Sequence, residues 1–105
     1  MSKFRVRLTK RALGHLQRID AWWRENRLAA PELFDSEAER ALDLLAETPF
    51  VGVPYQRLSG PPIRRLLLIE TRYHIYFDTN EDAAEVVIVA VWHASRDRPP
   101  PVSHR

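Results

Sequence analysis

IRRLLLIETRYHIYFD at residues 63–78 and EVVIVAVWHASRD at residues 85–97 are the stretches that decide the fold of this 105-residue chain. Both are rich in leucine, β-branched and aromatic side chains, and the turn formers between them predict three consecutive strands. The last strand is apolar on both faces, which is typical of a strand inside a sheet. It runs into a polar cluster that contains His93 and Arg96, so the sheet is expected to present chemistry at one edge. The three strands are expected at residues 63–69, 73–77 and 85–92.

The residues before this block predict one more strand and two helices. Residues 4–8, FRVRL, alternate between apolar and polar side chains, as a half-buried strand does. Thr9 supplies an N-cap hydroxyl for a helix that begins at Lys10 and carries an apolar stripe at three- and four-residue spacing. Pro31 is expected at the first position of a second amphipathic helix, which Pro49 ends.

The element order is therefore β-α-α-β-β-β. Residues 50–62 are rich in proline and glycine and are expected to be irregular. Because each helix must bury its apolar stripe, the sequence predicts an α+β fold. In it, an N-terminal helical hairpin packs on one face of a mostly antiparallel four-stranded sheet. The length allows one domain, expected at residues 1–98, and a short Pro-rich flexible tail at residues 99–105.

Composition excludes several classes of protein. There is no cysteine, so disulfides and thiolate metal sites are excluded. The net charge is +2, but residues 1–27 are strongly basic and residues 31–47 strongly acidic. The N-terminal residues do not resemble a signal peptide, so none is expected, and the longest apolar run, residues 86–92, is too short to span a bilayer. We therefore expect a cytoplasmic protein without a membrane partner. The histidines lack metal-ligand spacing, so no metal, cofactor or small-molecule substrate is expected.

This order of elements, with these residues, resembles the RelE/ParE family of toxins from bacterial type II toxin–antitoxin systems. The resemblance is carried by LLAETPFVG at residues 44–52, by IRRLLLIETRYHIYFD and by VVIVAVWHASRD, and it covers about residues 4–97. It implies a small toxic protein that a cognate antitoxin holds inactive. ParE-like members of the family inhibit DNA gyrase, whereas RelE-like members cut mRNA on the ribosome.

Two features favour the ParE-like branch, a non-enzymatic inhibitor of DNA gyrase. RelE-like nucleases typically carry a lysine-rich middle segment, whereas residues 50–59 contain Arg57 and no lysine. The residue after His93 is Ala94 rather than a catalytic tyrosine. The alternatives are a ribosome-dependent, metal-independent mRNA endonuclease and a degenerate, non-toxic member that only binds its antitoxin.

The candidate site residues gather at the ends of the predicted strands. Metal-free RNA cleavage needs an acid or base that titrates near neutral pH, as histidine does, and cations for the phosphate. If the chain is a nuclease, its catalytic residues are therefore His93, Arg65 and Arg96. The alternative interpretation is that His93 ends its strand and makes only a local hydrogen bond. A gyrase inhibitor is expected to bind its target through Arg64, Arg65, Tyr73, Trp92, His93 and Arg96.

Trp22 and Trp23 are the candidate antitoxin-binding residues. Adjacent residues of a helix cannot both point inward, so one tryptophan is expected in the core and the other partly exposed. An exposed tryptophan is a frequent hot spot of protein interfaces. The expected antitoxin has a partly disordered segment that folds over the helical hairpin and the sheet edges.

Overall fold

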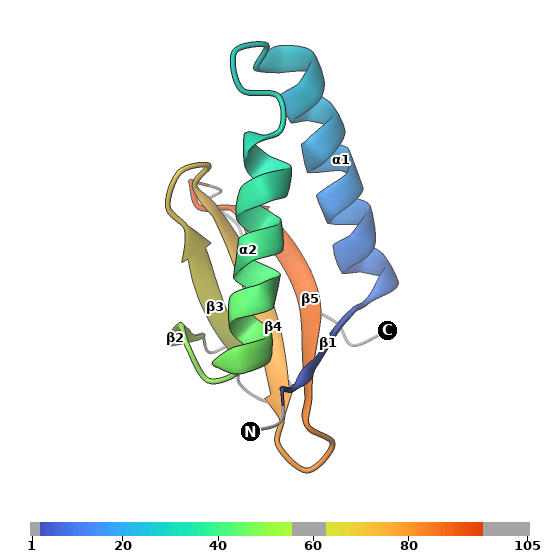
Figure 1. The fold of residues 1–105 in the computed structure, drawn as a ribbon, viewed down its shortest axis with the longest axis vertical. Helices are drawn as coiled ribbons and strands as arrows, with labels where there is room; N and C mark the ends of the chain where they lie inside the picture. Colours follow the sequence, from blue (N-terminus) through green and yellow to red (C-terminus); the bar gives the residue numbers. More distant parts are fainter. Residues whose placement is uncertain (1–2, 56–62, 96–105) are drawn as a thin grey trace.

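The computed structural model describes residues 3–55 and 63–95, which form one five-stranded sheet with two helices on one face (Figure 1). The strand order is β1-β5-β4-β3-β2, and β1 runs parallel to β5 while all other neighbours are antiparallel. The broad α+β class and the helical hairpin agree with the sequence. The elements are β1 (Arg5–Leu8), α1 (Lys10–Asn26), α2 (Leu33–Glu47), β2 (Val53–Tyr55), β3 (Ile63–Leu68), β4 (Tyr73–Asn80) and β5 (Glu85–His93).

The prediction of a four-stranded sheet was wrong, because β2 forms inside the stretch expected to be irregular. Gly52 has a φ of +94°, a backbone conformation that glycine adopts easily, and it turns the chain toward β3. Val53 and Tyr55 then pair with Arg65 and Ile63. Pro54 is tolerated because β2 is an edge strand, where one side needs no backbone donor. The predicted tail at residues 99–105 lies outside the described residues.

β5 is an inner strand, as its apolar sequence predicted, and a bulge divides it. Tyr76 pairs with Ala90 and Phe77 pairs with Ile88, so Val89 is an extra residue. Val89 and Ala90 consequently lie on the same face of the sheet, opposite the helices. The residues beyond the bulge keep alternating, so His93 faces the helices.

α1 begins as predicted, whereas α2 begins two residues later than predicted. The hydroxyl of Thr9 accepts a hydrogen bond from Ala12 N at 3.1 Å and caps α1. Pro31 does not open α2, because a turn closes first: Leu33 N donates to Ala30 O at 3.2 Å. The first helical bond of α2 runs from Ser36 N to Glu32 O at 3.0 Å.

The main core lies between the helices and the sheet. Phe34 and Leu45 of α2 pack with Ile75, Phe77 and Ile88, and all five are at most 1% exposed. β4 and β5 thus carry the apolar face on which both helices rest. Within the described residues, no helix has the length and apolar character that a membrane crossing requires.

The Gly52 turn predicts opposite effects for two glycine-to-alanine changes. A Cβ at Gly52 would lie 2.6 Å from Arg65 O, so Gly52→Ala should lower the free energy of unfolding by about 1–3 kcal/mol. Gly14 lies inside α1, and its Cβ would meet only the flexible end of Arg18. Gly14→Ala should therefore raise stability by about 0.5–1 kcal/mol. Urea unfolding measures both, and an unchanged midpoint for Gly52→Ala would contradict this account of β2.

Candidate functional site: a groove between α1 and the end of β5

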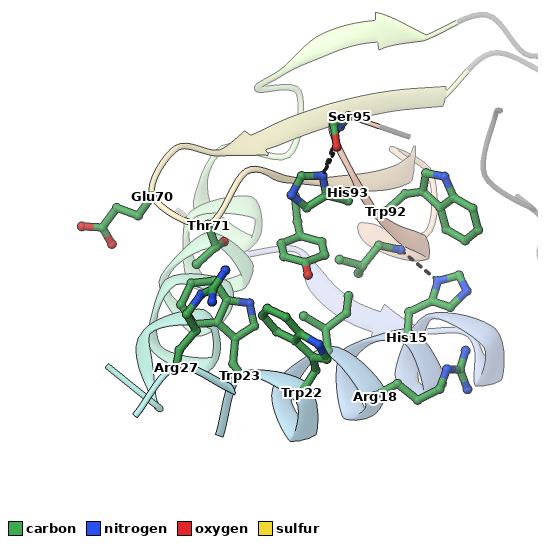
Figure 2. Close-up of a pocket in the computed structure, with 13 residues that line it drawn as sticks. His15, Arg18, Trp22, Trp23, Arg27, Glu70, Thr71, Trp92, His93 and Ser95 are labelled. Carbon is green, nitrogen blue, oxygen red and sulfur yellow. Dashed lines mark hydrogen bonds between the residues drawn. The ribbon is translucent and has the colours of Figure 1, made fainter. Parts of the chain in front are cut away.

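A groove of about 910 Å³ lies between the second half of α1 and the end of the sheet (Figure 2). One wall comes from α1 and includes Trp22, Trp23 and Arg27. The other wall comes from the end of β5 and the β3–β4 turn, and includes Tyr73 and His93. The groove therefore unites residues predicted to bind an antitoxin with residues predicted to bind a target.

His93 is held by its neighbours at the end of β5. Its Nδ1 accepts a hydrogen bond from Ser95 N at 3.2 Å and lies 2.7 Å from Ser95 Oγ. Tyr73 packs edge-on against the His93 ring at a centroid distance of 4.9 Å. The ring is thus oriented by local contacts with Ser95 and Tyr73, and Nε2 is the ring nitrogen left to meet a ligand.

The two tryptophans divide as the helix geometry predicted. Trp22 is 44% exposed, whereas Trp23 packs against the core. Their rings meet edge-on at 6.1 Å. The guanidinium of Arg27 lies 4.8 Å from the Trp22 ring and 5.7 Å from the Trp23 ring. This cation–π arrangement places a positive charge directly beside the apolar part of the groove.

Arg64 and Arg65 lie away from His93. Arg64 Nη1 donates to Gly52 O at 3.3 Å, and the alternation of β3 places Arg65 on the face opposite the helices. Arg65 pairs with Tyr76, three residues along β4 from the Tyr73–His93 pair, which corresponds to about 10 Å. The described residues therefore do not bring Arg65 and His93 to one point. Arg96 lies outside them.

A second cluster of aromatic and basic side chains occupies the face opposite the helices. Arg65 lies 5.2 Å from the Tyr55 ring, and Tyr76 packs against Tyr55 and His74 at 5.0 and 5.9 Å. Burial raises the pKa of Tyr76, and Arg65 partly offsets this effect. Burial lowers the pKa of His74, and the positive charges of Arg65 and Arg72 lower it further.

Glu37 anchors the β3–β4 turn, a role that sequence reasoning missed. Its carboxylate accepts hydrogen bonds from Glu70 N at 2.8 Å, Thr71 N at 3.0 Å and Thr71 Oγ1 at 2.6 Å. The turn then continues through Arg72, whose φ is +68° and whose carbonyl accepts from Ala94 N. A signal was present, because Glu37 sits on the buried stripe of α2 and a buried acid needs donors.

His15 fixes α1 against β5 where β1 has ended. β1 pairs with β5 only as far as Leu8 and Ile88. Three residues later, Val91 N donates to Nδ1 of the buried His15 at 3.1 Å, so a helix side chain replaces a strand partner. The ring of His15 also packs at 5.6 Å from the Trp92 ring. His15 and Trp92 both line the groove.

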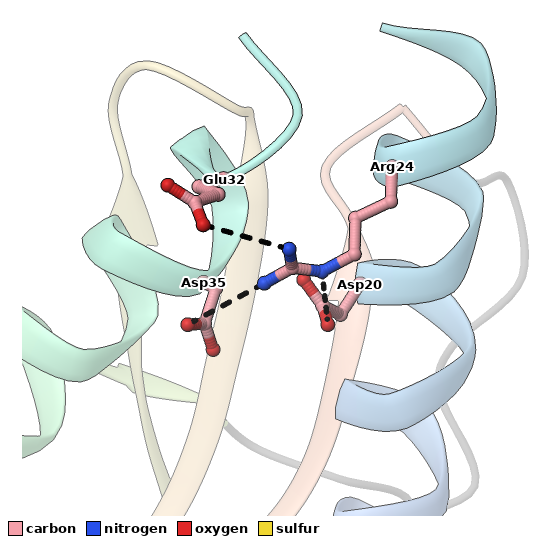
Figure 3. Close-up of polar contacts among 4 residues, drawn as sticks. All are labelled: Asp20, Arg24, Glu32 and Asp35. Atoms are coloured by element: carbon pink, nitrogen blue, oxygen red, sulfur yellow. Dashed lines mark hydrogen bonds and ion pairs between the residues drawn. The ribbon is translucent and has the colours of Figure 1, made fainter. Parts of the chain in front are cut away.

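Arg24 connects the C-terminal end of α1 to the N-terminal end of α2 (Figure 3). Its guanidinium contacts Asp20 at 3.0 Å, Glu32 at 3.7 Å and Asp35 at 3.9 Å. The hydrogen bond and charge of Asp20 raise the pKa of Arg24 above its ordinary value. All four side chains are solvent-accessible, so the network adds little stability. No group of three metal-ligating side chains occurs in residues 3–55 and 63–95.

Removing the Glu37 carboxylate should destabilise the chain. Glu37→Ala leaves two backbone donors and a hydroxyl without a partner, so the free energy of unfolding should fall by about 2–4 kcal/mol. Glu37→Gln keeps an acceptor for Thr71 and should lose about half as much. The matched control is Glu39→Ala, an exposed position on α2. Urea unfolding that does not separate Glu37→Ala from Glu39→Ala would contradict the anchoring role.

His74 should make stability depend on pH. Its folded pKa lies below the ordinary value of 6.5, so the unfolded chain binds the proton first as the pH falls. His74 therefore contributes a loss of stability that grows as the pH drops below about 6.5. His74→Gln should flatten the fall in urea midpoint between pH 7.5 and pH 5.5. An identical slope in wild type and variant would show that His74 titrates alike in both states.

Comparison with known proteins places this fold in a family. A family model described as the ParE toxin of the type II toxin–antitoxin system parDE matches residues 6–98. Among proteins with curated functions, none matches the chain. Solved structures also share the fold, at identities too low to show more.

The toxin–antitoxin complex RelBE2 from Mycobacterium tuberculosis is 24% identical, with a TM-score of 0.60, over 87% of this chain and 98% of the other. The isolated E. coli RelE toxin is 18% identical, with a TM-score of 0.57, over 90% and 87% of the two chains. The intact E. coli RelBE complex is 17% identical, with a TM-score of 0.56, over 89% and 99%. Since the family model spans most of its length, the chain belongs to the ParE toxin family of type II toxin–antitoxin systems.

Proposed function

We propose that this protein is a ParE-like toxin that inhibits DNA gyrase by binding it, and that a cognate antitoxin neutralises it. The observation that carries the proposal is the separation of His93 from Arg65. A phosphate undergoing cleavage needs its acid or base and its cation on the same side, within hydrogen-bond reach. Here His93 faces the helices and Arg65 faces away from them. A binding role requires no such convergence.

The groove supports binding to a protein surface. It exposes the large aromatic side chain of Trp22 beside Tyr73 and His93, and aromatic residues are enriched at interface hot spots. Membership in the ParE toxin family supports gyrase as the target. A cytoplasmic location is part of the proposal, since gyrase acts on chromosomal DNA in the cytoplasm.

Two similar structures are of toxins bound to antitoxins, which supports an antitoxin as the second partner. In the proposal, Trp22 and Trp23 contribute to that contact. A protein partner that covers the groove would also cover Tyr73 and His93, because all four residues line it. Neutralisation then follows from occupancy of the groove.

The second candidate function is a ribosome-dependent mRNA endonuclease, and one observation favours it. Arg65, Tyr55, Tyr76 and His74 form a basic and aromatic cluster on the face opposite the helices. Such clusters stack nucleotide bases and attract phosphates. In this alternative, His93 and Arg96 would act with Arg65 as the catalytic residues. A non-toxic member that only binds an antitoxin is the third candidate.

A supercoiling assay separates these candidates. The purified chain should inhibit DNA gyrase, and Tyr73→Ala and His93→Ala should each weaken inhibition about tenfold, as expected for interface hot spots. The control is Lys10→Gln, an exposed change at the opposite end of α1.

Induced expression of the protein in cells separates the three candidate functions. Gyrase-dependent DNA breaks without mRNA cleavage are expected. Translation-dependent mRNA cleavage that is lost in His93→Ala, together with normal supercoiling, would replace the gyrase proposal with the nuclease. Unchanged growth and unchanged supercoiling would favour the third candidate, a non-toxic member that only binds an antitoxin.

A further inference from the structure

We infer that Arg18 and Arg27 make the groove a receptor for an acidic peptide segment of the antitoxin. The segment places an apolar side chain on the tryptophans and its carboxylates on the two arginines. This inference rests on the proposed antitoxin partner and adds the chemistry by which that partner is recognised. Neither arginine was among the residues that the sequence singled out.

The first observation behind this inference is the charge of the groove. Arg18 and Arg27 are exposed and line the groove from α1, and neither makes an ion pair with a carboxylate of the described residues. Glu70 is an acid on the opposite wall, and it already contacts Arg40 at 3.5 Å. The groove therefore offers two guanidinium groups that form no ion pair with any carboxylate in residues 3–55 and 63–95. A carboxylate is the complementary ligand, because a guanidinium binds it through two parallel hydrogen bonds.

The second observation is the apolar surface of the groove. Trp22 is 44% exposed, and Ile19 and Tyr73 also line the groove. Arg27 covers part of both indole rings, so the cation and the apolar floor form one continuous surface. An occupant gains most when an apolar side chain and a carboxylate lie close together in its sequence. This pattern is typical of acidic segments that fold on a partner.

The hydrogen bonding of β5 limits how the segment binds. β5 extends five residues beyond its last pair with β1, which would favour strand addition along this edge. However, Val91 N already donates to His15 Nδ1, so the edge is closed at that point. Strand addition is therefore interrupted at Val91, so we expect side-chain contacts, those of the two arginines among them, to contribute to holding the occupant.

Single-stranded nucleic acid is the competing occupant, since arginine and tryptophan also bind bases and phosphates. The geometry favours a peptide. Arg18 lies on α1 and Arg27 at its C-cap, and among the described residues the opposite wall carries Glu70 and the aromatic ring of Tyr73 but no arginine or lysine. A nucleic acid carries a charge at every nucleotide and would place phosphates beside Glu70, whereas a peptide can place its carboxylates on the arginines and an uncharged side chain beside Glu70.

Selection from a displayed library of random 12-residue peptides tests the inference on the full-length chain. Enriched peptides should combine aspartate or glutamate with leucine or an aromatic residue. Binding of the best peptide, measured by fluorescence anisotropy, should weaken about tenfold in Arg27→Gln and in Trp22→Ala. The affinity of Arg27→Lys for the peptide should lie between those of wild type and Arg27→Gln, because lysine keeps the charge but lacks the planar guanidinium group. Lys10→Gln, on the same helix outside the groove, should bind like wild type.

Every other outcome counts against the inference. Enrichment of neutral or basic peptides, or acidic peptides insensitive to both Arg27→Gln and Arg18→Gln, would overturn it. So would a uridine 12-mer that binds more tightly than the selected peptide and competes with it. Circular dichroism of each variant identifies any loss of folding. The measurement involves no gyrase, so a negative result here leaves the supercoiling result standing, and the reverse holds too.

Discussion

The structure depends on burying both faces of β5, although the two helices of the described residues lie on one face only. The helices cover one face, where Ile88 and Val91 pack beneath them. On the other face Val87, Val89 and Ala90 are at most 5% exposed and form a second cluster. A strand buried twice must lie inside the sheet, and its neighbours β1 and β4 follow from that requirement. The bulge then decides which side chains leave the core at the strand's end.

Two polar contacts hold the sheet against the helices where the groove is formed. Glu37 holds the β3–β4 turn to α2, and His15 holds β5 to α1. Each uses a buried polar side chain to satisfy backbone donors far away in the sequence. Buried donors without partners are costly, so each contact allows little freedom in position. The walls of the groove are therefore rigid where they meet, and its exposed tryptophan and arginines lie at the outer rim.

Local patterns predicted most of the elements, whereas contacts distant in sequence did not follow from them. The Thr9 cap, the two helices of the hairpin and the inner position of β5 all follow from patterns within single elements. β2 was missed because Val53–Tyr55 becomes a strand only by pairing with β3. The bulge at Val89 is equally invisible in a sequence that is apolar at every position. The bulge places His93 on the helix side of the sheet and so separates it from Arg65, which lies on the other face.

The Arg24 network has a consequence for how a charged partner arrives. One guanidinium faces three carboxylates there, so this cluster carries excess negative charge. Three residues after Arg24, at the C-cap of α1, Arg27 carries positive charge into the groove. These two patches form a surface dipole that acts over about 10 Å at moderate salt. We expect this field to orient an acidic chain as it approaches the groove, so its association rate should fall as ionic strength rises.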